Sequence, residues 1–518
     1  MGTRTYLLAA LLGAGLLATA QPGTIDLAFG AGGITQYPIG TGHDVNRDLV
    51  VLPDDRFVVV GHTYDSITGF DWFAARFLSD GGWDTTFGVN GLVRFDLLGD
   101  EDGVNAVALQ PDGRLVLAGT SYDGTAMHAA VARLNSDGTL DGAFGINGVV
   151  VLPVDPVFDD NHATDVLVLP DSSLLVTGWA DRDAVWTNLG GSQGLWHLFA
   201  DGTPDNAFGN FAALAERDLF QDQLNDRALC CALRPDGLVA AAGGSFVNGY
   251  ERMSFAHWNT DGSVPGGFSE AYYMVPSSFS SHVVEVLPLI NSDQVLVGQA
   301  SSDLTYVHVD ATGALDPTFA TNGVYRMDLG PGNTSIPAHA LRTPDDHAVV
   351  VGTIYRGPEP SLYLHRIDLS TGMPDTLFGS GALVEWQISP DSSTVGTAIG
   401  MQSDGRLVVA GTYFNFAYNK PFVTRFQQDI TTDLRPASTV SSVRVAPNPF
   451  QYRTTVLGTE SGGTVELLDA MGRTLMHVRS AEGSTELVPP VLEAGPYLLR
   501  YRTSAGTQVV RVVRTGAP

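Results

Sequence analysis

The sequence predicts an all-β protein, because one pattern of short alternating apolar runs and tight turns recurs seven times along its 518 residues. The stretch LQPDGRLVLAG, residues 109–119, shows the pattern, with two runs joined at Asp112-Gly113. The aspartate side chain accepts hydrogen bonds from the backbone that follows it, and glycine readily adopts positive φ. The two runs are therefore expected to pair as a hairpin. A helical period of apolar residues is found nowhere in the chain, which leaves sheets as the expected architecture.

Two further elements accompany this hairpin along the chain. The first is a DxxFGxxG motif, whose seven phenylalanines set a period of 51 to 64 residues: Phe29, Phe87, Phe144, Phe208, Phe268, Phe319 and Phe378. The second is an apolar strand with one basic residue, namely Arg76, Arg133, His197, His257, His308, Arg366 or Arg425. Each period has room for four strands of about five residues. Seven repeats of four short strands predict a seven-bladed β-propeller of four-stranded blades over residues 21–428.

The basic residues of the repeat have two interpretations. Each can pair with the aspartate of a DxxFG motif, or all seven can face one cavity that attracts an anion. We expect pairing, because repeats duplicate structural needs more readily than a binding site. The closure of the ring also has two solutions: residues 24–39 complete the last blade, or every blade consists of consecutive strands.

Composition and charge narrow the compartment and the classes of partner. Residues 1–20 are expected to be a signal peptide, with Arg4 before an apolar run and a small-residue cleavage site at 18–20. No later stretch is apolar for long enough to cross a membrane. The net charge of −28, with Lys420 as the single lysine, disfavours a nucleic-acid partner because like charges repel. Cys230 and Cys231 are adjacent and expected to be buried apolar residues, which excludes a disulfide scaffold.

Function is expected where the repeats differ. Successive strands alternate direction, so the repeated turns share one face of the ring and the variable loops share the other. Exposed aromatic planes beside carboxylates such as Asp44 suit the faces and hydroxyls of a glycan, and carboxylates also suit Ca²⁺. The aromatic residues expected to contact a ligand there are Tyr64, Trp72, Trp186, Tyr250, Tyr355, Tyr413 and Tyr418.

No catalytic motif occurs in a suitable context. Residues 190–194 fit GxSxG, but a nucleophile elbow needs a strand-to-helix turn, and this segment is a loop between strands. No cysteine and histidine cluster has zinc spacing and no acidic run has EF-hand spacing, so neither a metal site nor a cofactor is expected. The protein is therefore expected to be a binding module for a glycan or a protein rather than an enzyme. Two alternatives stay open: a polysaccharide lyase or glycoside hydrolase with paired carboxylates on the loop face, and a purely structural surface protein.

The pairing of these motifs resembles the delta-60 repeat family. Its hallmark, LDxxFGxxG with LQPDGKILVAG, appears here at residues 140–148 and 109–119, and the resemblance covers about residues 24–428. It implies a β-propeller on an exported bacterial protein. The fifth repeat departs from the pattern, because residues 265–269 lack the aspartate and Asn291-Ser292-Asp293 replaces PDG, so that blade is expected to be irregular.

A polar linker, residues 429–442, is expected to lead into a second domain at residues 443–518. Short apolar runs separated by glycine turns predict a small β-sandwich of immunoglobulin-like type there. The runs are residues 464–468, 473–478, 497–502 and 508–513.

This second domain resembles the type A C-terminal sorting domain of the type IX secretion system of the Bacteroidota. The residues that carry the resemblance are Pro447, Asn448, Pro449, Phe450, Gly472, Gly495 and Tyr497. In that family the domain is an export address, usually removed once the cargo has crossed the outer membrane. The resemblance implies the type IX secretion machinery as a partner of residues 443–518. It also implies a protein that passes through the periplasm and is secreted or displayed on the outer-membrane surface.

Overall fold

The computed structural model divides into two compact units, Met1–Asp429 and Ile430–Pro518. In the first unit the described residues are 22–97, 99, 101–153, 160–181, 191–210, 213–219, 225–266, 270–273, 275, 280–414 and 417–427. In the second unit they are 444–446, 453–457, 459, 462–468, 474–481, 483–489, 495–503 and 506–514. The elements that these residues form are all β-strands, so the all-β prediction is confirmed.

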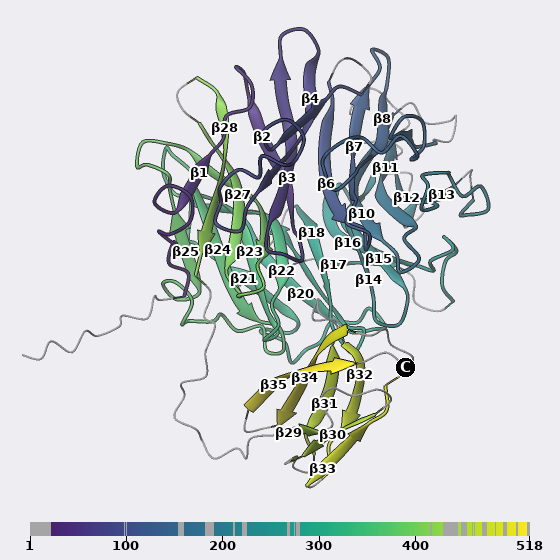
Figure 1. The fold of residues 1–518 in the computed structure, drawn as a ribbon, viewed down its shortest axis with the longest axis vertical. Coiled ribbons are helices and arrows are strands. Elements are labelled where there is room, and N and C mark those ends of the chain that lie inside the picture. Colours follow the sequence, from purple (N-terminus) through teal and green to yellow (C-terminus); the bar gives the residue numbers. More distant parts are fainter. Residues whose placement is uncertain are drawn as a thin grey trace, which may run out of the picture. The chain divides into compact units, whose positions relative to one another are not determined.

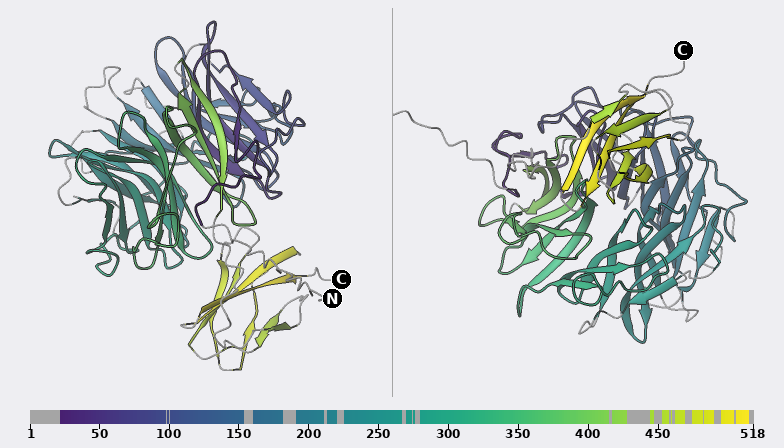
Figure 2. Two further views of the ribbon diagram at one scale, coloured as in Figure 1. Left: turned by 90° about the vertical axis from the view of Figure 1, so that its left-hand side faces the viewer. Right: turned by 90° about the horizontal axis from the view of Figure 1, so that it is seen from below.

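The described strands of the first unit form seven four-stranded antiparallel sheets, which follow one another around a ring (Figure 1, Figure 2). The first three sheets are β2 (Asp44–Val51), β3 (Phe57–Asp65), β4 (Gly69–Phe77) and β5 (Leu92–Phe95); β6 (Gly103–Leu109), β7 (Leu115–Tyr122), β8 (Met127–Leu134) and β9 (Val149–Val151); and β10 (Asp160–Val168), β11 (Leu174–Asp181), β12 (Ser192–Leu198) and β13 (Leu214–Arg217). The next three are β14 (Asp226–Leu233), β15 (Val239–Val247), β16 (Tyr250–Trp258) and β17 (Glu270–Tyr273); β18 (Ser281–Pro288), β19 (Gln294–Ala300), β20 (Asp303–Val309) and β21 (Val324–Met327); and β22 (Thr334–Arg342), β23 (His347–Tyr355), β24 (Ser361–Asp368) and β25 (Leu383–Trp386). The seventh contains β26 (Thr394–Met401), β27 (Leu407–Phe414), β28 (Asn419–Phe426) and β1 (Ile34–Gln36).

The seventh sheet closes the ring with strands from both ends of the unit. β1 pairs antiparallel with β28, so that Ile34 lies opposite Thr424 and Gln36 lies opposite Phe422. The innermost strands of the seven sheets are β2, β6, β10, β14, β18, β22 and β26. Each lies beside the innermost strand of the next sheet, and β26 lies beside β2. Of the two closures that the sequence allows, the structure therefore has the one in which residues near the start of the unit complete its last sheet.

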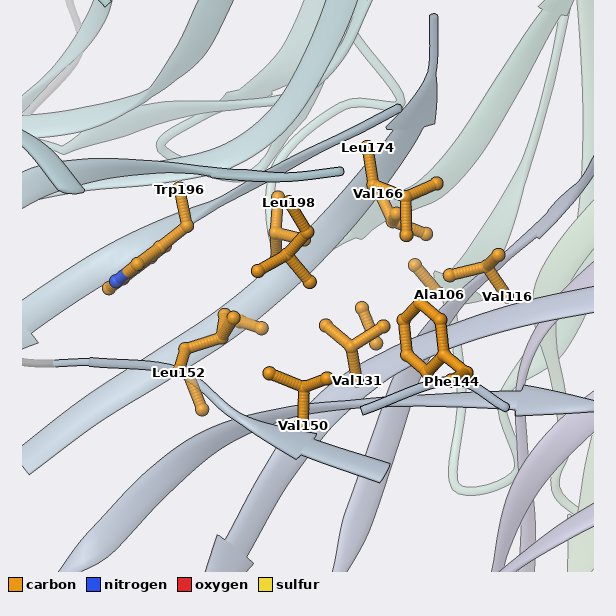
Figure 3. Packing of buried hydrophobic residues seen from close by; sticks show 14 of the residues in the cluster. Ala106, Val116, Val131, Phe144, Val150, Leu152, Val166, Leu174, Trp196 and Leu198 are labelled. Atoms are coloured by element: carbon orange, nitrogen blue, oxygen red, sulfur yellow. The ribbon is translucent and has the colours of Figure 1, made fainter. Parts of the chain in front are cut away.

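The hydrophobic core is divided among the interfaces between neighbouring sheets. Between the second and third sheets, Phe144 and Val150 pack in one buried cluster with Leu174 and Leu198 (Figure 3). The phenylalanine of the DxxFG motif is buried in the same way elsewhere in the described ring, at Phe29, Phe87, Phe208, Phe319 and Phe378. The strongest motif of the sequence is thus a core position that joins one sheet to the next.

Each innermost strand contains one register shift, where an extra residue is inserted. In β2 the extra residue is Arg47, between Asn46 and Asp48, and the same shift occurs in β6, β10, β14, β18, β22 and β26. A bulge bends the strand and moves the alternation of side chains by one residue. The residue that follows each bulge therefore lies on the side opposite to the one that regular alternation assigns.

The described residues of the second unit form two sheets around one core. A three-stranded sheet is formed by β29 (Arg444–Ala446), β30 (Thr454–Leu457) and β33 (Ser484–Leu487). A four-stranded sheet is formed by β32 (Thr474–Arg479), β31 (Thr464–Leu468), β34 (Gly495–Thr503) and β35 (Gly506–Arg514). Val456 and Leu487 of the first sheet share a buried cluster with Leu467 and Leu499 of the second. The described residues of this unit thus have their own hydrophobic core.

Candidate functional site

The basic residue of the repeat is held in a compact network at the repeated turns. Arg133 Nε donates to Asp141 Oδ2 at 2.9 Å, and its guanidinium carbon lies 4.5 Å from the centre of the Phe144 ring. Its Nη1 also donates to the carbonyl of Ala200, which lies in the turn after β12 of the next sheet. Burial opposes ionisation of Asp141, but the hydrogen bonds from Ala143 N and Arg133 leave its pKa below the usual value. One arginine thus orders its own turn and ties it to the neighbouring sheet.

The same contact recurs around the described ring. Besides Arg133, the basic residue meets the aspartate in the pairs Arg76–Asp84 at 2.8 Å, Arg425–Asp26 at 2.7 Å, Arg366–Asp375 at 3.0 Å, His197–Asp205 at 3.0 Å and His308–Asp316 at 3.3 Å. These side chains are directed at their own turns. The alternative in which all seven basic residues face one cavity does not describe this geometry.

The seventh basic residue, His257, lies in the repeat whose motif lacks the aspartate. Arg234 stands where Gln110 stands in the second repeat, and its Nη1 lies 2.6 Å from His257 Nε2. Arg234 pairs with Asp236 at 2.7 Å. Burial, followed by the charge of Arg234, lowers the pKa of His257 to about 4. In this repeat the cation is Arg234 of the hairpin rather than the basic residue of the strand, and His257 is neutral at neutral pH.

A cavity of about 270 Å³ lies on the repeated face between the first and second sheets. Its walls include Leu52, Leu109 and Leu115, together with Arg56 and Arg76. The two arginines already share ion pairs with aspartates of the turns, so the cavity offers an entering ligand no unbalanced charge. No group of three His, Cys, Asp or Glu in the described residues could hold a metal ion.

Of the aromatic residues expected to contact a ligand, Trp72 does not lie on the surface. It is fully buried, because alternation along β4 directs it into the interface between the first and second sheets. A β-carbon on Gly119 of the second sheet would lie 2.8 Å from its ring. The prediction that Trp72 contacts a ligand is therefore wrong. Trp186 lies outside the described residues.

Two of the predicted tyrosines come together at the seam where β1 closes the ring. Tyr64 and Tyr418 are 42% and 43% exposed. Gly42 lies against the Tyr64 ring, where a β-carbon would come within 2.8 Å, and the His43 ring lies 5.5 Å from the Tyr418 ring. We call these four residues the seam cluster. Its two tyrosines come from opposite ends of the ring's sequence, and they flank one short segment.

The segment that carries Gly42 is held by the single lysine. Lys420 Nζ donates to the carbonyls of Gly40 and Gly42 at 3.0 and 2.9 Å, and to Asp44 Oδ2 at 2.9 Å. Asp44 also accepts a hydrogen bond from Thr63 Oγ1 at 2.5 Å and is fully buried. Asp44 is thus a structural group beneath the loop rather than a surface carboxylate. The single occurrence of lysine in the sequence is the one signal that could have drawn attention to this contact.

The remaining predicted residues lie apart from the seam cluster or beside it. Tyr413 is partly buried, and its hydroxyl donates to Gln36 Oε1 at 3.3 Å. Tyr250 and Tyr355, 44% and 41% exposed, stand on the fourth and sixth sheets. The structure therefore places the exposed tyrosines on several sheets and brings only Tyr64 and Tyr418 around a shared segment in the part of the chain that it describes.

Most of the motif in the second unit falls outside the described residues, namely Pro447, Asn448, Pro449, Phe450 and Gly472. Gly495 begins β34 opposite Arg514, and Tyr497 is buried in the core of the unit. Arg500 donates to Glu466 Oε2 at 2.6 Å, a buried ion pair between neighbouring strands.

Comparison with known proteins agrees with this architecture. Residues 110–144 match a protein-family model described as "Domain of unknown function (DUF5122) beta-propeller". The fold is a β-propeller. A search of curated proteins finds no match. No helix among the described residues is long and apolar enough to span a membrane.

Several solved structures are similar to this propeller. A catalytically inactive virginiamycin B lyase from Staphylococcus aureus is 9% identical with a TM-score of 0.41, and 76% of this chain and 98% of that chain are covered. The polysaccharide lyase Uly1 is 10% identical with a TM-score of 0.45 and coverage of 76% and 92%. PorZ, a surface component of the type IX secretion system of Porphyromonas gingivalis, is 10% identical with a TM-score of 0.19 and coverage of 91% and 81%. At these identities the likenesses concern the fold alone.

Proposed function

We propose that this protein is an exported binding module, a seven-bladed β-propeller that presents its variable face to a glycan or a protein. The observation that carries the proposal is the seam cluster, in which two half-exposed tyrosines flank Gly42 and His43. Aromatic planes beside peptide groups suit the apolar faces and hydroxyls of a sugar. The opposite face supports the same choice, because its repeated charged groups are engaged in ion pairs within the turns. The delta-60 resemblance is consistent with a propeller scaffold of this kind.

Replacing Tyr64 or Tyr418 with alanine is expected to weaken binding to a glycan about fivefold each, since a ring contact of this kind contributes roughly 1 kcal/mol. A glycan and polysaccharide array would first identify the ligand, and the dissociation constants of the variants would then be measured by titration. Calcium and a chelator would be included in parallel arms, because carboxylates near the loops suit Ca²⁺.

Tyr250→Ala and Tyr355→Ala are the matched controls, since these tyrosines are equally exposed on other sheets. They are expected to leave affinity unchanged. Binding that survives the double replacement of Tyr64 and Tyr418 would contradict the seam cluster as the site. An array without any hit would contradict the proposal that the ligand is a glycan, and it would favour a protein partner or a structural role.

We propose further that residues 1–20 are a signal peptide and that residues 443–518 are a type IX sorting domain of immunoglobulin-like type, joined to the propeller by a linker at residues 429–442. Two features support this assignment for the second unit. It has its own hydrophobic core, as an independently folding domain requires, and a buried Arg500–Glu466 pair. Tyr497, one of the residues that carry the resemblance, belongs to that core. The protein would then reach the cell surface or the medium through the periplasm.

Deleting residues 443–518 is expected to stop release of the protein from the cell and to leave it in the periplasm. Cell fractions and medium would be compared by immunoblotting. The thermal unfolding of the truncated protein serves as the control, because the propeller has separate hydrophobic cores and should unfold as before. Unchanged release of the truncated protein would refute the sorting role.

A further inference from the structure

Three carboxylates lie at matching positions on the innermost strands of the ring. Asp48, Asp165 and Glu285 each directly follow the bulge of β2, β10 and β18. Asp48 Oδ2 accepts a hydrogen bond from Val107 N at 2.8 Å, and Asp165 Oδ2 accepts one from Cys231 N at 2.8 Å. Each bond runs from one sheet to the innermost strand of the next.

Glu285 continues the series into the sixth sheet. It accepts a backbone hydrogen bond from Ala340, and its Oε2 lies 3.2 Å from His339 Nε2. His339 also follows a bulge, and its Nδ1 accepts a hydrogen bond from Ile399 N of the seventh sheet at 3.3 Å. Because Nδ1 is an acceptor, the proton of the neutral ring is on Nε2, where it can be donated to Glu285. The residues after the bulges thus link successive innermost strands.

No lysine or arginine neutralises these carboxylates in the part of the chain that the structure describes. Arg47, the extra residue of β2, lies near His62 instead, and the pKa of His62 is lowered first by burial and then by the charge of Arg47. At the positions that follow the other bulges, β6 and β26 carry alanines and β14 carries Cys230, whose pKa burial raises so that it remains a neutral thiol. The described acids and histidines do not gather closely enough to hold a metal ion.

Burial makes ionisation of all three carboxylates costly. It raises the pKa of Asp48 to about 6. It also raises the pKa of Asp165, with the charge of Asp48 adding to the effect and His339 opposing it. The pKa of Glu285 is raised well above its usual value, first by burial and then by the charges of Asp165 and Asp48. The charge of Asp48 therefore disfavours ionisation of Asp165, and the charges of both disfavour ionisation of Glu285.

We propose that these three carboxylates bind protons in the folded protein and make the contact between the innermost strands sensitive to pH. The contact is stable when the carboxylates are protonated, and their mutual repulsion and burial destabilise it when they are ionised. We call this arrangement the lock. A protonated carboxyl group still accepts the backbone hydrogen bond through its carbonyl oxygen, so protonation removes the repulsion without breaking the link between sheets. The device lies in the scaffold and is independent of the seam cluster.

The sign of the effect follows from linkage. A carboxyl group whose pKa is higher in the folded than in the unfolded protein stabilises the fold fully below about pH 4. For Asp48 that contribution is lost as the pH rises through about 6. Burial lowers the pKa values of His162 and His257 to about 4, so these histidines remove stability as the pH falls below about 6.5. The profile of the native protein is a sum of both groups, and differences between variants at one pH isolate the carboxylates.

The test compares Asp48→Asn, Asp165→Asn and Glu285→Gln with the native protein by thermal unfolding at about pH 5 and about pH 8. Each amide keeps an oxygen that accepts the backbone hydrogen bond but cannot ionise. At the higher pH each variant is expected to unfold about 2–4 °C above the native protein, and at the lower pH the gain is expected to be clearly smaller. Asp112→Asn, an exposed carboxylate on a repeated turn, is the matched control and should change neither midpoint.

An equal loss of unfolding temperature at both pH values would overturn the proposal, since it would mean that the carboxylates act only as ionised acceptors. Stabilisation of the native protein at high pH by Ca²⁺, absent in the variants, would also overturn it in favour of a metal. The native protein supplies a further measurement that needs no variant. Its infrared spectrum should contain protonated carboxyl bands near neutral pH that disappear in alkali, and their absence would refute the lock.

Discussion

Removal of residues 22–36 is expected to abolish cooperative folding of the propeller. These residues supply β1, the outer strand of the seventh sheet, and Asp26, whose Oδ2 accepts from Arg425 Nε at 2.9 Å. They also supply Phe29, which packs in the core of the first and seventh sheets. Without them Arg425 is a buried cation that lacks its counterion, which alone costs about 3–5 kcal/mol. Few domains have a free energy of unfolding above about 15 kcal/mol, so the combined loss of these interactions is expected to exceed the stability of the propeller.

Circular dichroism melts of chains that begin at residues 21 and 37 would measure this effect. The longer chain should unfold in one sharp transition, and the shorter chain should show a broad one or none. A synthetic peptide of residues 22–39 added to the short chain should restore part of the transition, because the pairing of β1 with β28 is intermolecular in that mixture. Identical melts of the two chains would show that the ring does not depend on closure by β1.

Replacing Arg133 with methionine is expected to destabilise the propeller by about 3 kcal/mol. Asp141 would lose its buried cation and keep only the more exposed Arg114 at 3.2 Å, and the carbonyl of Ala200 in the turn after β12 would lose its donor. The pair lies beneath a surface turn rather than deep in the core, which places the cost at the lower end of the range for buried pairs. The double variant Arg133→Met/Asp141→Asn should recover part of the loss, because the carboxylate that has lost its buried cation is then replaced by a neutral amide.

Urea unfolding of these variants would give the free energies of unfolding. Arg356→Met is the matched control, since Arg356 forms an exposed ion pair with Glu385 at 3.1 Å. Such pairs contribute less than about 1 kcal/mol. Equal effects of Arg133→Met and Arg356→Met would mean that the contacts of Arg133 stabilise the protein no more than a surface ion pair does. The interpretation of the basic residue as a link between sheets would then fail.

The candidate site was predictable only in part. The exposed Tyr64 and Tyr418 follow from the rule that variable loops share one face, and the structure places both at the surface. The same rule assigns the aromatic Trp72 to that face, but Trp72 is buried. The alternation of a strand assigns a side chain to one of two faces, and it does not say which face the neighbouring sheet covers. Only the packing of sheet on sheet separates these cases.

The sequence by itself determined the repeating unit. The period of the phenylalanines, the turn residues of LQPDG and the spacing of eight residues between Arg133 and Asp141 are local features, and local chemistry decides hairpins and turns. In the second unit the strand β31 coincides with the apolar run at residues 464–468, for the same reason.

The tertiary structure alone decided how the repeats close and what their interior contains. The pairing of Ile34 with Thr424 joins residues far apart in the chain, and no periodicity encodes such a contact. The bulge at Arg47 moves Asp48 by one residue and so places a carboxylate toward the neighbouring innermost strand. An inserted residue reverses the face of every residue that follows it, and it leaves no mark in a sequence pattern that is read with a period of two.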